Sequence, residues 1–179
     1  ETGTIKITLP QSWTSTMLRF TVKIYDYTVN ESFEVVCAGY TYGTGSAWYN
    51  TSAYIISDTE SDRNFTVRFG HDGSKCAVYI GETAATWSYP QITVTDFQAG
   101  FNNAQASKWE DGWDVTLESS FGTITATQDT AGSAFSFSQS YTQGDAVPTS
   151  AATVGTVPNF SSTTSYASGT AGDLAGTVL

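Results

Sequence analysis

The chain has 179 residues, a formal net charge of −10 and only seven Lys or Arg residues. Because phosphate binding needs clustered Lys or Arg, this balance excludes nucleic acid and argues against anionic membrane surfaces as partners. No uncharged apolar run approaches the roughly 18 residues of a membrane-spanning helix, so we expect no membrane insertion.

The composition favours strands. Aromatic residues make up 14% of the chain and charged residues 13%, and Ser and Thr fill the polar positions that Lys and Glu would fill in a helical protein. Lys108 is the last basic residue, so residues 109–179 carry no positive side chain. A chain of this length supplies one domain's worth of core. The asymmetry of charge suggests one β domain followed by an extended, weakly packed tail.

Apolar and polar residues alternate with period two in a series of short runs. In the run 17–27, for example, Leu18, Phe20, Val22 and Ile24 fall on one side. This pattern predicts strands with one buried and one solvated face. The predicted strands are 4–9, 17–27, 33–40, 48–56, 65–69, 75–80, 91–97, 113–118, 123–127 and 134–141.

Turn residues separate these runs. Asp72-Gly73 stands between two alternating runs and predicts a hairpin with His71 in its loop, and Asp111-Gly112 is a second turn signal. The alternation slips by one residue at Asp96-Phe97, which indicates a β-bulge. Many short strands with regular turns and no helical stripe predict an all-β fold, an antiparallel β-sandwich of jelly-roll-like type with an extended C-terminal tail.

The tail begins where apolar residues become sparse. We place the boundary near Gly144, with a β-sandwich domain at 1–144 and a Ser, Thr, Gly and Ala-rich segment at 145–179. Such a composition cannot bury enough surface within one chain to offset its ordering entropy. Either identical neighbours order this segment, or it is a disordered linker.

The sequence offers little for metal, cofactor or catalytic chemistry. Cys37 and Cys76 lie within strand-like runs, where they are either two buried free thiols or one cross-strand disulfide. His71 is the only histidine, and no nucleophile motif accompanies it. The alternating acids of 58–62 lack the glycine and the closing glutamate of a calcium loop. We therefore expect no cofactor, no metal site and no catalytic residues.

Two groups of aromatic residues are candidates for holding sugar rings, because aromatic faces beside hydrogen-bonding oxygens combine stacking with hydroxyl recognition. In the run 108–114, two tryptophans flank three carboxylates across a tight turn. The alternative is that both indoles are anchors in the core or in an interface. Glycoside cleavage by Glu110 and Asp114 has no further support in the sequence. The candidate glycan contacts are Trp109, Glu110, Asp111, Trp113, Asp114, Tyr40 and Tyr42.

Three runs, at 4–13, 63–82 and 86–101, resemble a module found in bacteriophage tail fibres and related side fibres. The resemblance covers about residues 3–126 and is specific in those runs. It implies a homotrimer that links the virion to the host surface, is assembled in the host cytoplasm and carries no catalytic residues. This chain is then either a portion of a fibre or a short virion protein that reuses the module.

Two functions follow as expectations. The first is a non-enzymatic structural and adhesion component of a phage tail fibre or other virion fibre. Its partners would be two further copies of itself, other virion or tail proteins, and a host surface glycan. The alternative is a secreted carbohydrate-binding module, for which the aromatic-rich sandwich and the run 108–114 are the motivation.

Overall fold

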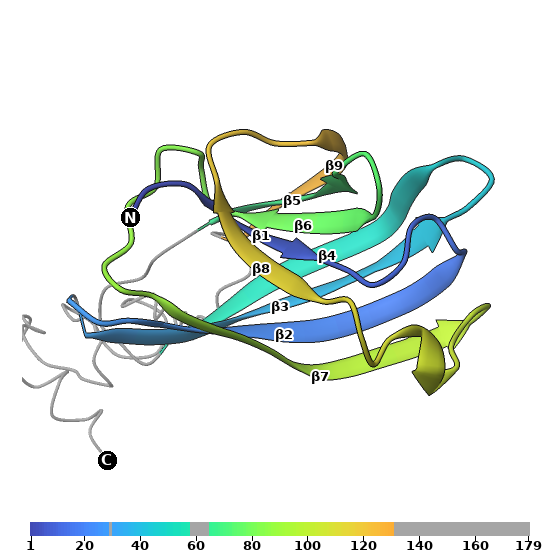
Figure 1. The fold of residues 1–179 in the computed structure, drawn as a ribbon, viewed down its shortest axis with the longest axis horizontal. Helices are drawn as coiled ribbons and strands as arrows, with labels where there is room; N and C mark the ends of the chain where they lie inside the picture. The colour runs from blue at the N-terminus through green and yellow to red at the C-terminus, as the bar shows by residue number, and fades with distance from the viewer. Residues whose placement is uncertain (29, 58–64, 131–179) are drawn as a thin grey trace, which may run out of the picture. The chain divides into compact units, whose positions relative to one another are not determined.

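Two antiparallel sheets pack face to face in the computed structural model, which describes residues 1–28, 30–57 and 65–130. The elements are β1 (Thr4–Thr8), β2 (Thr16–Asp26), β3 (Glu31–Tyr42), β4 (Ala47–Ser57), β5 (Thr66–His71), β6 (Cys76–Ile80), β7 (Gln91–Phe101), the 3-10 helix η1 (Ala106–Lys108), β8 (Asp114–Glu118) and β9 (Thr123–Asp129). One sheet has five strands in the order β8-β1-β6-β5-β9, and the other has four in the order β4-β3-β2-β7 (Figure 1). The predicted antiparallel β-sandwich is confirmed.

The alternation along β2 shows how the sequence sets the two faces of a sheet. Leu18, Phe20, Val22 and Ile24 are each exposed by 5% or less, whereas Met17 is 55% exposed. Successive side chains of a strand point to opposite faces, so every second residue meets the other sheet. Burying one such side chain fully contributes about 1.5–3 kcal/mol. The other strands contribute Ile5, Ile7, Phe33, Val35, Cys37, Trp48, Ile55, Val67, Phe69, Cys76, Val78 and Ile80 to the same core.

The strand pairing is nested in the manner of a jelly roll. β1 pairs with β8 in one sheet, and β2 pairs with β7 in the other. The chain therefore returns along its own earlier path, which is the arrangement that characterises jelly rolls. β2, β3 and β4 depart from that pattern, because they form a simple antiparallel meander.

The predicted hairpin joins β5 to β6. The carboxylate of Asp72 accepts hydrogen bonds from the amides of Ser74 and Lys75 at 2.9 and 2.8 Å, and Gly73 has φ of +105°, a conformation that glycine adopts without strain. His71, expected in the loop, is instead the last residue of β5, because it pairs with Cys76.

The predicted bulge lies in β7. The register of β7 against β2 shifts between Arg19 and Thr21, and Asp96 opposite this shift has φ of +55°. An extra residue in one strand of an antiparallel pair produces this slip and turns the local side chains. The phase change at Asp96-Phe97 is therefore confirmed as a bulge.

Hydrogen bonds close the sandwich along the side where β4 meets β5 and β9. The indole nitrogen of Trp48 donates to the carbonyl oxygen of Gly70 at 2.9 Å, and the amide of Trp48 donates to Oγ1 of Thr125 at 3.0 Å. Nε2 of Gln128 donates to Oγ1 of Thr51 at 2.9 Å. These bonds tie the edge strand of one sheet to the other sheet.

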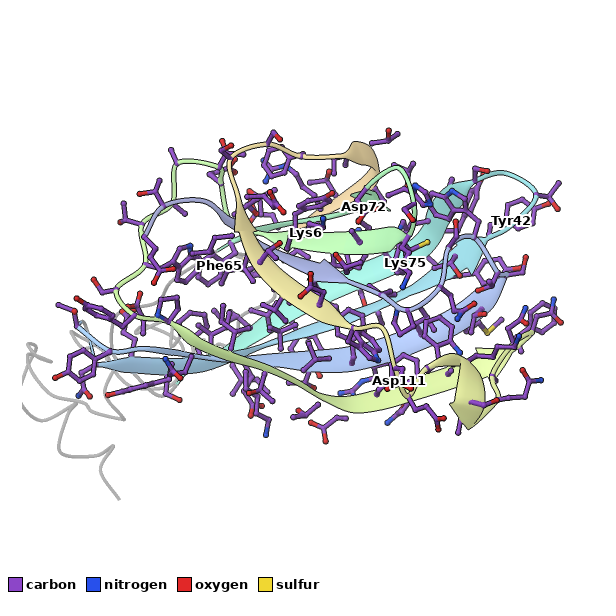
Figure 2. The ribbon with its side chains drawn as sticks, viewed as in Figure 1. Lys6, Tyr42, Phe65, Asp72, Lys75 and Asp111 are labelled. Carbon is purple, nitrogen blue, oxygen red and sulfur yellow. The ribbon has the colours of Figure 1, made fainter. Side chains whose placement is uncertain are left out.

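Near one end of the core, Phe65 lies between Phe33 and Trp87. Its ring centroid is 5.3 Å from that of Phe33 and 5.7 Å from that of Trp87, in stacked geometry. Figure 2 labels Phe65. Trp87 in turn donates its indole hydrogen to the carbonyl oxygen of Gly3 at 2.9 Å. This stack connects β3, the residue directly before β5 and the segment before β7.

Cys37 and Cys76 are both free and buried, as the first of the two sequence interpretations has it. Burial raises the pKa of the Cys37 thiol to about 12 and raises that of Cys76 as well. Both therefore act as small apolar side chains. The predicted strand 134–141, the boundary at Gly144, the tail 145–179 and the acids of 58–62 lie outside the described residues.

Two glycines of the four-stranded sheet make a matched pair for testing this packing. A Cβ at Gly39 would lie 2.8 Å from Cε3 of Trp48 and 3.1 Å from Cγ2 of Thr51, whereas a Cβ at Gly100 would meet nothing within 4 Å. We expect Gly39→Ala to lower the free energy of unfolding by roughly 1–3 kcal/mol, and Gly100→Ala to change it by less than about 0.5 kcal/mol. Urea denaturation followed by fluorescence measures both, and equal effects would contradict the packing described.

Candidate functional site

Trp109, the first tryptophan of the predicted sugar-binding run, is a core residue. It is only 4% exposed, and its ring centroid lies 5.0 Å from that of Phe97. Its indole nitrogen donates to the carbonyl oxygen of Asn103 at 2.6 Å. A ring so enclosed has no face for a sugar, which corrects the expectation for Trp109 in favour of the anchor interpretation.

Trp113 is partly buried and also packs inward. Its ring lies edge-on to Phe20 and Phe97, with centroid separations of 5.5 and 5.1 Å. Its indole nitrogen donates to the carbonyl oxygen of Trp109 at 2.7 Å. The two tryptophans therefore hold the connection from β7 to β8 against the sandwich.

The three carboxylates of the same run are exposed and stand around these anchors. Glu110 and Asp111 lie in the loop before β8, and Asp114 is the first residue of β8. One oxygen of Asp114 accepts from the amide of Val115 at 3.0 Å. Figure 2 shows Asp111 in this loop, apart from Tyr42 at the β3–β4 hairpin, so the two predicted groups are separate surfaces.

A groove lies where the edge strands β7 and β8 face each other, and we call it the edge groove. Its volume is about 490 Å³, within the range of ligand sites. Trp113 and Asp114 were candidates from the sequence, while the β7 residues were not. The only signal for them was the phase slip at the bulge. The edge groove is lined by Val94, Thr95, Asp96, Phe97, Trp113, Asp114 and Val115.

A second surface lies on the outward face of the four-stranded sheet, and we call it the aromatic platform. It consists of Met17, Tyr40, Tyr42, Tyr49 and Phe101. Tyr40 stands opposite Met17 on one side and opposite Tyr49 on the other. Cross-strand register thus brings Met17, Tyr40 and Tyr49 into one row. Phe101 of β7 pairs with Thr16 and has φ of +71°, and its ring meets that of Tyr40.

The rings of the aromatic platform pack against one another. Tyr40 stacks on Tyr42 with centroids 5.8 Å apart, Tyr42 lies edge-on to Tyr49 at 5.5 Å, and Tyr40 lies edge-on to Phe101 at 6.2 Å. Tyr49 is nevertheless 49% exposed and Phe101 67% exposed. Tyr40 and Tyr42 were candidates from the sequence. Met17 and Tyr49 were missed because only the strand register places them opposite Tyr40, and Phe101 was missed because its contact with Tyr40 is seen only in the folded chain.

The five-stranded sheet presents a polar outward face instead. Nζ of Lys6 lies 3.2 Å from a carboxylate oxygen of Asp72 and 3.7 Å from one of Glu118. The hydroxyl of Tyr79 accepts from the amide of Gly122 at 3.0 Å. Lys6, Asp72 and Glu118 therefore pair with one another on this face, and these ion pairs account for the presence of their charges.

Arg68 of β5 lies opposite Tyr79 of β6 and extends that polar face onto β5. Its guanidinium donates to both carboxylate oxygens of Glu82 at 2.9 Å and lies 4.4 Å above the ring of Phe121. A bidentate pair and a cation–π contact fix this side chain.

Among residues 1–28, 30–57 and 65–130, no group of three or more His, Cys, Asp or Glu is placed to hold a metal ion. Within the same ranges, no helix has the length and hydropathy of a membrane span.

Comparison with known proteins adds no relative. The chain matches no protein-family model, no curated protein and no solved structure. Any functional proposal for this chain therefore rests on its own sequence and geometry.

Asp72 makes the stability of the fold depend on acid pH. Burial acts to raise its pKa, but the amides of Lys75 and Ser74 and the ammonium of Lys6 outweigh burial and lower it. Its stabilising contribution is therefore present above the ordinary Asp pKa of roughly 3.9 and is lost as the pH falls through the lower folded value.

We expect Asp72→Asn to lower the free energy of unfolding by about 1 kcal/mol at neutral pH, and the difference from wild type to shrink as the pH falls below the ordinary Asp pKa. Urea denaturation at a series of pH values measures this. Lys6→Met should remove part of the same pH dependence, because it deletes one of the groups that lower the pKa. A difference that stayed constant across the series would show that Asp72 does not titrate as described.

Proposed function

We propose that this chain is a non-enzymatic structural and adhesion component of a bacteriophage tail fibre or other virion fibre, in which three copies assemble. The observation that carries the proposal is the place of the three fibre-like runs in the fold. The run 4–13 contains β1, the run 63–82 contains β5 and β6, and the run 86–101 contains β7. These strands and their connections form one connected structural unit.

The first two runs are joined by direct contacts. β1 pairs with β6, and the amide of Cys76 donates to the carbonyl oxygen of Gln11 at 3.0 Å. Nε2 of His71 lies 2.8 Å from Oγ of Ser12, and the His71 ring stacks on Trp13 at a centroid separation of 5.1 Å. Residues that the resemblance singles out separately in the sequence are therefore neighbours in space.

The third run meets the start of the chain. Thr2 and Thr86 form an isolated β-bridge, and the amide of Trp87 donates to the carbonyl oxygen of Glu1 at 2.8 Å. The run continues into β7, a strand of 11 residues that, among the residues the structure describes, pairs in its sheet with β2 alone. The outer edge of β7 offers main-chain groups to a neighbouring copy.

Light scattering coupled to size exclusion tests the assembly. We expect the purified full chain to have a mass three times that of one copy at the concentrations at which fibres assemble. A strict monomer over that range would contradict the fibre proposal. Electron microscopy of the particle from which the chain comes would then show at which place on that particle the chain lies.

The second candidate is a secreted carbohydrate-binding module. The aromatic platform favours it, because exposed rings on a sheet face are suited to stacking on sugars. A monomer that binds a glycan would support this second candidate over the fibre.

A further inference from the structure

The aromatic platform exposes apolar side chains on the outward face of its sheet, although the inward face of the same strands is already packed against the core. Met17, Tyr49 and Phe101 are 55%, 49% and 67% exposed. The core on the other face of the same strands is already filled by Leu18, Phe20 and their neighbours. The platform rings therefore add little to the core, and a ligand is what would bury them.

The charge of the platform restricts that ligand. None of its five side chains is charged, in a chain whose formal net charge is −10. Arg19, in the adjacent row of the same face, donates to the hydroxyl of Tyr54 at 3.3 Å. An anionic ligand would thus meet no cation within the platform, and a neutral ligand fits best.

The polar groups at the platform suit hydroxyl-rich molecules. Tyr40, Tyr42 and Tyr49 each combine an apolar ring with a hydroxyl that donates and accepts hydrogen bonds. Asn50 and Asn102 follow directly after Tyr49 and Phe101, and both are exposed. The three tyrosines therefore combine stacking surface and hydrogen-bonding groups at one place, as in sites that hold rings with one apolar face, and the two asparagines follow the platform residues in the chain.

The size of the platform points to a small ligand. A stable protein interface takes about 20–30 residues on each side, and the platform consists of five. Gly100 lies opposite Met17 within it, and a Cβ there would meet nothing within 4 Å. This glycine leaves open space beside Met17 on the outward face.

We propose that the aromatic platform binds neutral sugar residues of a surface glycan. The C–H faces of the sugar rings lie against Tyr40, Tyr49 and Phe101, and the sugar hydroxyls bond to the tyrosine hydroxyls and to the amides of Asn50 and Asn102. This inference deepens the adhesion role proposed above and rests on it, by naming the ligand class and the surface that recognises it.

The test uses the full chain and an array of neutral and anionic oligosaccharides, with affinities then measured by titration calorimetry. We expect wild type to bind at least one neutral glycan and Tyr49→Ala and Phe101→Ala each to weaken that binding about tenfold. The matched controls are Tyr27→Ala and Tyr89→Ala. Tyr27 and Tyr89 are 62% and 71% exposed and form an edge-on pair at 6.3 Å outside the platform. We expect both controls to bind as wild type does.

A second variant keeps every ring in place. Gly100→Lys sets a long side chain across the platform without deleting an aromatic group, and we expect it to weaken glycan binding about tenfold as well. Gly100→Ala serves as its folding control, because its Cβ meets nothing within 4 Å. Loss of binding in Gly100→Lys alone would still support the proposal if an alanine variant failed to fold.

Three results would overturn the inference: no neutral glycan bound at millimolar concentration, binding to anionic glycans alone, or equal affinity in platform and control variants. Light scattering on the same samples separates the two proposals. A monomer that binds neutral glycan would remove the fibre and keep the platform. A trimer that Tyr49→Ala dissociates would make the platform an interface between copies and end the glycan proposal.

Discussion

Buried indole nitrogens need hydrogen-bond acceptors, and this constraint sets the arrangement of the whole sandwich. Four tryptophans each donate to a main-chain carbonyl oxygen: Trp48 to Gly70, Trp87 to Gly3, Trp109 to Asn103 and Trp113 to Trp109. A buried polar group left without a partner costs roughly 1–3 kcal/mol. Each indole therefore holds a second segment at a fixed position. Together these bonds fix the side of the sandwich where β4 meets β5, the N-terminal segment, and the connection from β7 to β8.

The same constraint divides the aromatic side chains into two groups with different roles. Tryptophans point inward and hold strands and loops together, whereas the tyrosines of the aromatic platform point outward, where water can satisfy their hydroxyls. Tyr40 and Trp48 show the division within one sheet, since Tyr40 joins the outward row and Trp48 is 3% exposed. In the glycan proposal, the residues that contact the ligand are therefore different residues from those that hold the strands together.

Much of the fold could be predicted from the sequence, because burial in a strand follows a period of two. The bulge at Asp96 and the hairpin at Asp72 were visible in the same way, as a slip and as a turn signal. The site could be predicted only in part. Whether Trp109 is buried in the core or exposed to solvent depends on how the chain folds back at η1. The cross-strand neighbours of Tyr40 depend on strand register, which the pattern of one strand alone does not specify. The edge groove likewise arises from two strands distant in sequence.

The division between inward and outward aromatic residues is tested most directly by the free energy of unfolding of two variants. We expect Trp48→Ala to lower the free energy of unfolding by about 3–5 kcal/mol, because it leaves a cavity and removes the hydrogen bond from the indole to Gly70. The double variant Tyr49→Ala/Phe101→Ala should lose less than about 1 kcal/mol, because both side chains are about half exposed or more. A double variant as unstable as Trp48→Ala would show that the platform holds the fold together, and would contradict its role as a binding surface.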